Sequence, residues 1–539
     1  MFINYILLAF QYSMTAAGKE FVIAFLKNSV NSYKPYLKIL TPFVEDVELQ
    51  ISTPAWNSVD SFHLTYTVNK SYPLEVKLPF RLRVQTSTVD NRIVYVKSSK
   101  PIFVFAADFQ RDTGSYFLLY PVKTFGTEYI VGAFGNANSR NSELKSLLGC
   151  LAIHTDTEIR ITPPVNQLLT FNKRTYKHDE EVVVTINRFQ LAQIMGIDVT
   201  GSFVRSNKPI AVISGHEHVM VHGNSEIVSG HDMIMAQMPP VATLSNVYPV
   251  ASTSNNDEEL IRVFAVHDNT AFSIYSPGSV ISQFIKDRTS YFEFYIAKNE
   301  GATVVADNPV QVIQISTSGD RFTGDPRMIV TLSLDSYVTE YMFVTTVDAA
   351  FPNAIYTHTV IIIVSESAKG KLYLDGKSII NIPHEGTPSS CGYANLEAIR
   401  INVDAGYHTL GCHLEDNEYC TVYLNGYFKN SQYGTAINRH LGVLGSSKSS
   451  SLQEMGGTDT GPMTTALFRV AAVDKKPSTA SKITFYVSSF IECHLLCRQY
   501  NNCALVTFEK TQNTCKLFTM YAASSALAEE PGVVISIIA

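Results

Sequence analysis

The side chains best able to do chemistry are concentrated in one histidine-rich segment, residues 216–232. Its potential metal ligands are His216, Glu217, His218, His222, His231 and Asp232. In a β-strand, His216 and His218 would point to the same side, so both could reach one ion. Imidazole binds zinc and copper well, which makes His216, His218, His222 and His231 candidate ligands. The alternative, which we favour, is a polar loop that holds no metal and no other cofactor.

The chain lacks the short motifs that mark common catalytic sites. His-Glu-His at 216–218 and His-Glu-Gly at 384–386 do not match the H-E-x-x-H motif of zinc hydrolases. The phosphate-binding G-x-x-x-x-G-K-[ST] loop and the G-x-S-x-G turn of serine hydrolases are also missing from the sequence. We therefore expect no enzymatic activity. A metal-dependent hydrolase built on residues 216–232 is the alternative.

Four of the eight cysteines lie in the last fifth of the chain, at Cys493, Cys497, Cys503 and Cys515. Such density is typical of a disulfide framework in an oxidising compartment. A zinc site is the competitor, but the spacing C-x3-C-x5-C-x11-C lacks paired C-x2-C knuckles. The spacing therefore favours disulfides.

The other four cysteines lie in the long first part of the chain. Cys412 and Cys420 end and begin two apolar runs that we expect to form a hairpin, which would bring them close enough for a bridge. Cys150 lies within an apolar run and is expected to be a buried free thiol. Cys391 could pair with Cys150, with Cys420 or with another chain.

Repeated sequence patterns indicate the elements that must carry these residues. An X-Pro pair followed by a β-branched run occurs at Lys100-Pro101, Lys208-Pro209 and Asn308-Pro309. Proline at the first position of a strand costs nothing, because no ladder donor is needed there. Similar openings begin at Gly18, Gly126, Ser245 and Val338, and each is followed by two apolar runs around a turn, as in a hairpin. The pattern predicts one β-unit used four times.

Composition supports an all-β body. The chain has 539 residues, of which 45% are hydrophobic and only 17% charged, and Val, Ile, Thr, Tyr and Phe favour sheets. Units of about a hundred residues fit tandem β-sandwich-like repeats. A β-propeller with two blades per unit is the alternative. The expected units are 18–125, 126–244, 245–337 and 338–445.

Charge and apolar runs narrow the partners and the location. The net charge is -6 and no basic run occurs, so nucleic acid is not expected as a partner. Residues 1–17 resemble a signal peptide, and no other apolar run is long enough to predict a membrane span. Asn69-Lys70-Ser71 is a weak candidate for N-glycosylation. These features predict a secreted, extracellular protein.

A change in composition separates a small C-terminal domain from this body. Residues 446–463 are rich in Gly, Ser and Thr and are expected to form a linker. The segment FIECHLLCRQYNNCALVTFEKTQNTCKLF, residues 490–518, resembles the PAN/apple module, an α+β fold, within residues 464–539. The resemblance implies the disulfides Cys493–Cys515 and Cys497–Cys503, and binding to proteins or glycans.

The body resembles the N-terminal domain family of IgG Fc-binding proteins. The matching stretches are residues 198–219, 231–252, 264–274, 324–346, 406–412 and 422–434. The family is extracellular, β-rich and non-catalytic, and its known vertebrate member belongs to mucus. At two places where the family usually carries cysteines this chain has His218 and His231, so a family disulfide is expected to be missing. Fc binding is not carried over, because these motifs define no binding residue.

Together these features predict a secreted, non-enzymatic binding or structural protein. Its setting would be mucus, extracellular matrix or a cell surface, and its partners would be extracellular proteins or glycans bound through exposed loops. An alternative is a lectin that holds sugar through the PAN module or the sandwich loops.

Overall fold

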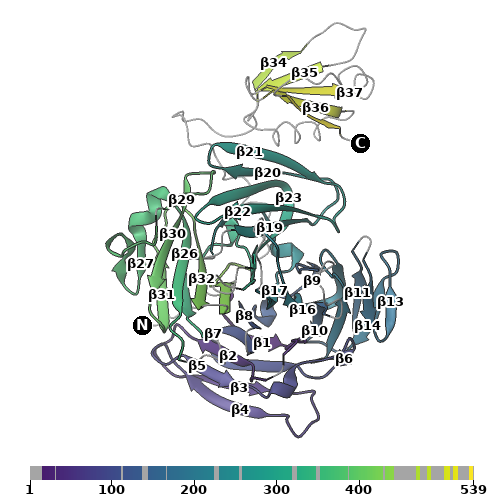
Figure 1. Ribbon diagram of the computed structural model, residues 1–539, viewed down its shortest axis with the longest axis vertical. Helices are drawn as coiled ribbons and strands as arrows, with labels where there is room; N and C mark the ends of the chain where they lie inside the picture. The colour runs from purple at the N-terminus through teal and green to yellow at the C-terminus, as the bar shows by residue number, and fades with distance from the viewer. Residues whose placement is uncertain are drawn as a thin grey trace.

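The computed structural model describes residues 15–441 and five strands between residues 469 and 537. Within the first range it leaves out 31, 111–112, 136–143, 165–166, 224–229, 254–257, 319–324, 348–352, 387 and 429–430. The described part is built almost wholly of antiparallel β-strands, which confirms the predicted fold class. Four units follow one another around a ring, so that the last unit lies beside the first (Figure 1). The ring closure was not predicted for the sandwich repeats, and it resembles the closed arrangement of the propeller alternative.

Unit 3 shows the repeated pattern in its simplest form. Its sheet has the order β21-β20-β23-β19-β22, with β18 and β24 pairing to β23. The strands are β18 (Ser245–Ala251), β19 (Glu258–Ala265), β20 (Thr270–Ser276), β21 (Ser279–Ile285), β22 (Tyr291–Ala297), β23 (Gly301–Ser316) and β24 (Met328–Val330). The 16-residue β23 pairs with β18 and β20 along its first half and with β19 and β24 along its second. One long strand therefore ties the whole unit together.

Units 1 and 2 repeat this arrangement around their own long strands, β7 and β16. Unit 1 contains β1 (Gly18–Ile23), β2 (Tyr36–Leu40), β3 (Val47–Ser52), β4 (His63–Val68), β5 (Leu74–Lys77), β6 (Val89–Asp90), β7 (Val94–Gln110) and β8 (Thr113–Leu118). Unit 2 contains β9 (Gly126–Ile130), β10 (Ser146–Ala152), β11 (Thr157–Thr162), β14 (Val182–Ile186), β15 (Leu191–Gly196), β16 (Phe203–Val219) and β17 (Asp232–Met238). Unit 2 adds a hairpin, β12 (Leu169–Phe171) and β13 (Arg174–Tyr176), and β6 crosses over from unit 1 to pair with β15.

Unit 4 departs from the pattern because its long strand is divided in two. β31 (Tyr407–Cys412) pairs with β25 (Glu340–Val344) and β27 (Leu372–Leu374). β32 (Cys420–Phe428) pairs with β26 (Thr357–Ser365) and β33 (Ser431–Ala436). The remaining strands are β28 (Lys377–Ser378), β29 (Ser389–Ser390) and β30 (Leu396–Val403). Together β31 and β32 pair with the other strands of unit 4 as the single long strand β7, β16 or β23 does in the other units.

Each continuous long strand has an irregularity at its X-Pro pair. The pairing register shifts between residues 97 and 102, 205 and 210, and 305 and 310. Two residues before each proline, a short polar side chain accepts a backbone N–H from the neighbouring strand. The bonds are Glu48 N to Ser99 Oγ at 3.0 Å, Glu158 N to Asn207 Oδ1 at 2.9 Å, and Ala271 N to Asp307 Oδ1 at 3.0 Å. These bulges let one strand serve two sets of neighbours.

The centre of the ring is made by the last strand of each unit. β8 contacts β17 and β33, and β24 also contacts β17 and β33. Short 3-10 helices then lead into the next unit: η2 (Val122–Thr124), η3 (Val241–Thr243) and η4 (Leu334–Ser336). The expected unit boundaries at 126, 245 and 338 each lie two residues after the last residue of one of these helices.

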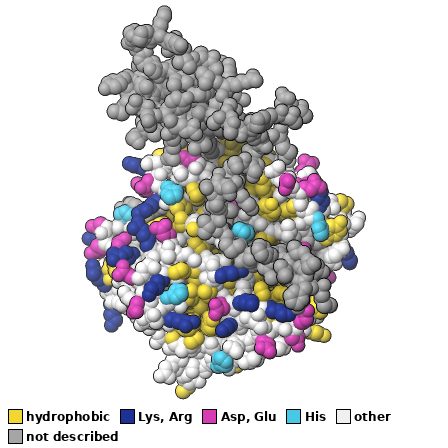
Figure 2. Space-filling view, turned by 180° about the vertical axis from the view of Figure 1, so that it is seen from behind, with side chains coloured by type: hydrophobic (Ala, Val, Ile, Leu, Met, Phe, Trp, Pro, Cys, Tyr) yellow, Lys and Arg dark blue, Asp and Glu magenta, His cyan; other side chains and the backbone are white. Residues whose placement is uncertain are grey.

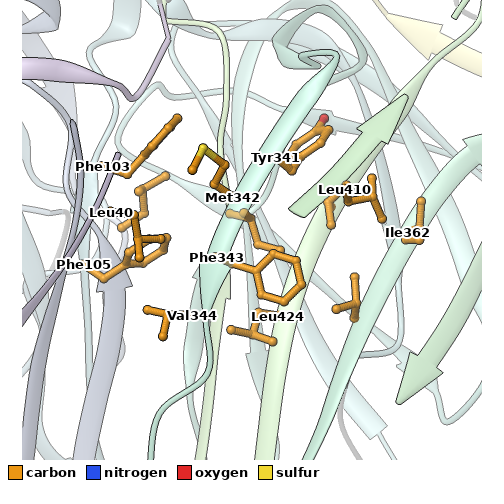
Figure 3. Packing of buried hydrophobic residues seen from close by; sticks show 14 of the residues in the cluster. Leu40, Phe103, Phe105, Tyr341, Met342, Phe343, Val344, Ile362, Leu410 and Leu424 are labelled. Atoms are coloured by element: carbon orange, nitrogen blue, oxygen red, sulfur yellow. The ribbon is translucent and has the colours of Figure 1, made fainter. Parts of the chain in front are cut away.

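The first and last units are joined at the chain ends of the body. Ala16 N donates to Arg439 O at 3.1 Å, and Thr15 forms an isolated β-bridge with His440. Apolar side chains from both units share one buried cluster, in which Phe103 and Phe105 lie near Tyr341 and Phe343 (Figure 3). Similar clusters join units 1 and 2, units 2 and 3, and units 3 and 4. The ring is therefore held by burial at every junction.

The expected signal peptide, residues 1–17, falls mostly on residues 1–14, which lie outside the described residues. It stays a prediction. Ala16 and Ala17, at its expected end, are fully buried in the body. No described helix has the length and apolar character needed to cross a bilayer.

The C-terminal strands form a separate antiparallel sheet with the order β34-β35-β37-β36-β38. They are β34 (Arg469–Val473), β35 (Lys482–Tyr486), β36 (Cys503–Glu509), β37 (Thr514–Thr519) and β38 (Val533–Ile537). In the pairing of β36 with β37, Cys503 lies opposite Thr519 and Cys515 lies opposite Phe508. Cys493, Cys497 and the expected linker lie outside the described residues, so Cys493–Cys515 and Cys497–Cys503 stay predictions.

Candidate functional site

The histidine-rich segment covers the end of β16 and the start of β17, close to the centre of the ring. His216 is fully buried. Its Nδ1 accepts the backbone N–H of His218 at 3.1 Å, and its Nε2 contacts no partner among the described residues. Burial and, to a smaller extent, the charge of His218 lower the pKa of His216 to about 3. His216 is therefore a neutral core histidine at physiological pH.

Glu217 joins unit 2 to unit 1. It is fully buried, and its carboxylate pairs with Lys27 Nζ at 2.9 Å. It also accepts the backbone N–H of Lys145 at 2.7 Å. A buried carboxylate needs such partners, so this side chain is already used by the fold.

Asp232 is a second buried carboxylate at a junction between units. It accepts backbone N–H groups from Gly114 of unit 1 and from Met233. Burial raises the pKa of Asp232 well above its usual range, and the nearby Asp325 of unit 3 raises it further. Three units therefore meet at this side chain.

His218 and His231 stack on each other with ring centroids 5.3 Å apart. These are the two positions at which the resemblance implied that cysteines are replaced by histidines, and the structure places the two rings in contact. Burial, and then the charge of His231, lowers the pKa of His218 to about 4. His222 is exposed.

The four candidate metal ligands are not brought together as a metal site. Among the described residues, no group of three or more His, Cys, Asp or Glu side chains could hold a metal ion. The register shift between His216 and Val219 interrupts the regular strand on which the shared-face prediction rested. Glu217 and Asp232 bond to other units instead of completing a site.

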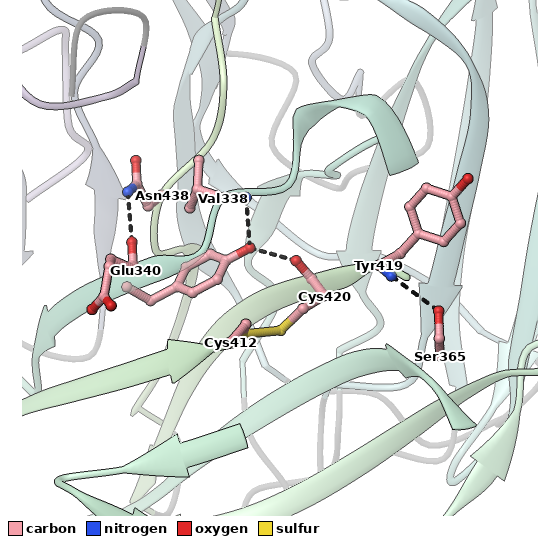
Figure 4. The surroundings of a disulfide bond; sticks show 8 residues. Val338, Glu340, Ser365, Cys412, Tyr419, Cys420 and Asn438 are labelled. Atoms are coloured by element: carbon pink, nitrogen blue, oxygen red, sulfur yellow. Dashed lines mark hydrogen bonds between the residues drawn. A yellow bond between two sulfur atoms is a disulfide. The ribbon is translucent and has the colours of Figure 1, made fainter. Parts of the chain in front are cut away.

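Cys412 and Cys420 form a disulfide, as predicted (Figure 4). The predicted reason was wrong, because β31 and β32 do not pair as a hairpin. Each pairs with other strands, and the bridge spans the break in the long strand of unit 4. Beside it, Tyr341 Oη accepts Val338 N–H at 3.2 Å and donates to Cys420 O.

Cys150 and Cys391 are both free and buried. They lie in different apolar clusters, so the predicted buried thiol at Cys150 is confirmed and Cys391 pairs with neither Cys150 nor Cys420. Burial raises the pKa of the Cys391 thiol to about 12. A thiol in this state is a poor nucleophile.

Asn69, the glycosylation candidate, lies at the turn between β4 and β5 and is partly exposed. Its Nδ2 donates to Asp46 Oδ1 at 2.8 Å, and its Oδ1 accepts the backbone N–H of Ser71 at 3.1 Å. The position suits a surface glycan, which stays a prediction.

Two open cavities lie on the rim of the ring, in places that the sequence motifs did not indicate. The larger, of about 580 Å³, is formed by residues 52–57 and 61–63 between β3 and β4, and it includes Trp56. The smaller, of about 440 Å³, is lined by Ile153, His154, Thr155, Arg188 and Lys208. In the smaller cavity Lys208 Nζ already donates to Thr155 O at 2.6 Å. In the larger cavity, the exposed side chains of Asn57, Ser61 and His63 make no such bond to the described residues.

Comparison with known proteins decides the family. The model of the IgGFc binding protein family matches residues 115–426, more than half of the chain. The chain belongs to this family. A PAN domain model matches residues 470–536, so both resemblances inferred from the sequence are confirmed. The IgGFc-binding protein of Homo sapiens is 22% identical over 329 residues, which cover 60% of this chain and 6% of that protein.

Proposed function

We propose that this chain is a secreted, non-enzymatic protein that binds other extracellular proteins or glycans through the rim of its ring. Mucus, extracellular matrix and cell surfaces are the settings that suit such a protein. The observation that carries the proposal is that the buried carboxylates of the histidine-rich segment are used to join units of the ring. Glu217 and Asp232 each bond to a neighbouring unit.

Two further buried ion pairs among the described residues also serve the framework. Glu259 and Arg327 form a buried ion pair at 3.1 Å, and Arg327 Nε also donates to Asn425 of unit 4 at 3.1 Å. Arg83 and Asp108 form another buried pair within unit 1. Breaking such pairs is costly, so these groups serve the framework. Recognition is left to the exposed loops.

The surface supports binding of proteins or neutral glycans over binding of nucleic acid. Acidic and basic side chains are interspersed on the face shown in Figure 2, together with hydrophobic ones. A nucleic-acid site would need basic side chains gathered on one face. The net charge of -6 agrees with this conclusion.

Affinity capture with the full secreted chain tests the proposal. The purified chain is immobilised and incubated with mucus extract, with extracellular matrix extract and, in a separate arm, with IgG Fc. We expect a defined extracellular protein or glycoprotein to bind the native chain and not the heat-unfolded chain. The Fc arm is included because the human relative bears the name IgGFc-binding protein.

A panel of hydrolase assays and metal analysis of the same preparation test the non-enzymatic part of the proposal. Stoichiometric metal together with hydrolysis that is lost in His216→Ala/His218→Ala would overturn the non-enzymatic proposal. Failure of every extract to yield a binding partner would overturn the binding proposal. Capture by the isolated segment after residue 463 alone would assign recognition to the PAN module and not to the ring.

A further inference from the structure

We propose that the cavity between β3 and β4 is a binding site for a neutral saccharide, with Trp56 as its stacking platform. The cavity lies in unit 1, outside residues 115–426 that match the family model. It deepens the proposed function, since it names a ligand class and a place on the rim. Its volume of about 580 Å³ falls within the range of roughly 300–1,000 Å³ that is usual for small-ligand sites.

The cavity combines aromatic rings with uncharged polar groups. Trp56 and Phe62 are partly buried and pack against the apolar cluster shared by units 1 and 2, so their rings are fixed. Asn57, Ser61 and His63 are exposed and also line the cavity. An aromatic face suits the C–H side of a sugar ring, and fixed rings lose little freedom on binding.

Three exposed polar side chains of the cavity are available to bind a ligand. The side chains of Asn57, Ser61 and His63 make no hydrogen bond to the part of the chain that the structure describes. The amide of Asn57 offers both donors and acceptors, as does a neutral imidazole. Sugar hydroxyls also both donate and accept, so they could replace the water at each of these groups.

Charge and polarity decide between ligand classes. No Asp, Glu, Lys or Arg lines the cavity, so it lacks the partner that an acidic or basic ligand would need. An apolar peptide would cover the three polar side chains and leave them unpaired, at a cost. A neutral, hydroxyl-rich ligand satisfies both the rings and the polar groups.

The loop that forms the cavity is held in shape by its own bonds. Thr53 N donates to Phe62 O, and Phe62 N donates to Thr53 Oγ1, both at 3.1 Å. Trp56 N donates to Thr53 O at 3.2 Å. Asp60 pairs with Arg81 Nη1 at 3.0 Å, which ties the loop to the neighbouring 3-10 helix η1 (Phe80–Leu82). The site is therefore formed before a ligand binds, which favours affinity.

Trp56 is the only tryptophan of the chain, so tryptophan fluorescence reports on this site alone. The full secreted chain is titrated with chitotriose, N-acetyllactosamine and mannotriose, and with sialylated N-acetyllactosamine as the charged counterpart. We expect a saturable change in emission with at least one neutral oligosaccharide. No change with any of them, or a change with the sialylated sugar alone, would overturn the proposal.

Variants separate binding at this cavity from binding elsewhere. Asn57→Ala and His63→Ala should each weaken affinity by about three- to tenfold, the loss expected for one hydrogen bond. Thr65→Ala, an exposed polar residue on the adjoining β4, should change it by less than about twofold. Equal affinity in the Asn57→Ala/His63→Ala double variant would overturn the site.

Trp56→Phe, measured by calorimetry, tests the platform itself. The ring packs on the apolar cluster, so a thermal melt must first show that this variant folds. Asn57→Ala and His63→Ala change exposed side chains and keep the test valid if Trp56→Phe is unstable. The affinity capture of a protein partner is measured separately. A negative result for the saccharide site therefore leaves the wider binding function open to its own test.

Discussion

Unit 4 and units 1–3 reach the same arrangement of strands by different means. In units 1–3 one strand of 16 or 17 residues runs through the unit and bends at an X-Pro bulge. In unit 4 the corresponding strand is interrupted by residues 413–419, and the Cys412–Cys420 disulfide joins the two parts. A disulfide therefore links the two strands of unit 4 where the other units have one continuous strand. The comparison suggests that the break is tolerated because the bridge limits the freedom of the loop.

The first strand of each unit shows a smaller difference of the same kind. Tyr129 Oη accepts Gly126 N–H at 2.9 Å and donates to Ile210 O at 2.6 Å. Tyr341 makes the corresponding pair of bonds, to Val338 and to Cys420. In unit 1 the equivalent residue is Phe21, which has no hydroxyl group. The tyrosine thus ties the start of the unit to the long strand β16 in unit 2 and to β32 in unit 4, and unit 1 lacks this tie.

The largest expected effect concerns the far end of the long strand in unit 2, where His218 stacks on His231. The pKa of His218 is lowered to about 4, first by burial and then by His231. Because His218 has its ordinary pKa of about 6.5 in the unfolded chain, the unfolded chain binds a proton at this side chain more readily than the folded protein. The free energy of unfolding is therefore unaffected by His218 above about pH 6.5 and falls as the pH falls from 6.5 toward 4. Wild type should lose about 3 kcal/mol more than His218→Phe over this range.

Denaturant unfolding at a series of pH values measures this difference. His218→Phe keeps an aromatic ring for the stack and removes the titrating group. His267→Gln, at an exposed turn of unit 3, is the control and should follow wild type. If the free energy of unfolding changes with pH in the same way for wild type and His218→Phe, His218 does not contribute to the acid sensitivity of the protein.

Removing the bridge of unit 4 is expected to have the next largest effect. Cys412→Ala/Cys420→Ala frees a loop closed over 8 residues, which should lower the free energy of unfolding by about 2–3 kcal/mol. Cys391→Ala, which removes a buried unpaired thiol, is the control and should cost about 1 kcal/mol. Non-reducing peptide mapping should recover the 412–420 bridge in wild type. A double variant as stable as wild type would mean that the split strand needs no covalent bond.

The comparison between units also shows what the sequence could reveal. The X-Pro pairs and the four openings repeat in sequence, so the all-β class and the repeated unit were predictable from local pattern. Ring closure was not, because it depends on contacts such as Ala16 N to Arg439 O, between residues 423 positions apart. No periodicity within a unit encodes a contact over that distance.

The candidate site shows the same limit. The sequence indicated that His216, Glu217, His218 and Asp232 lie near one another, but it could not reveal that the carboxylates bond to other units. It found the Cys412–Cys420 pair from its short separation, while the divided strand that explains the pair appears only in the sheet pairing. The Trp56 cavity carries no motif, since its loop is defined by shape and by hydrogen bonds to Thr53.

The tyrosine bond offers a sharper test of the same comparison. Tyr341→Phe removes a buried hydroxyl group and leaves Val338 N–H and Cys420 O without this partner, which should cost about 1–2 kcal/mol. Tyr66→Phe, on the partly exposed β4, is the control and should cost less than about 0.5 kcal/mol. Thermal and denaturant unfolding measure both. A Tyr341→Phe variant as stable as the control would mean that unit 4, like unit 1, needs no hydroxyl group at this position.

The smallest effect is expected at the polar side chain before each X-Pro pair. Asn207→Ala removes the acceptor for Glu158 N–H, an exposed bond that water can partly replace. The expected loss is about 0.5–1 kcal/mol, whereas Asn207→Asp should keep the bond and most of the stability. Hydrogen exchange at Glu158 is the most direct readout, since its amide should exchange faster in Asn207→Ala while amides of β20 in unit 3 stay unchanged. Unchanged exchange at Glu158 would mean that proline and the strand register alone set the bulge, and that the three polar side chains are incidental to it.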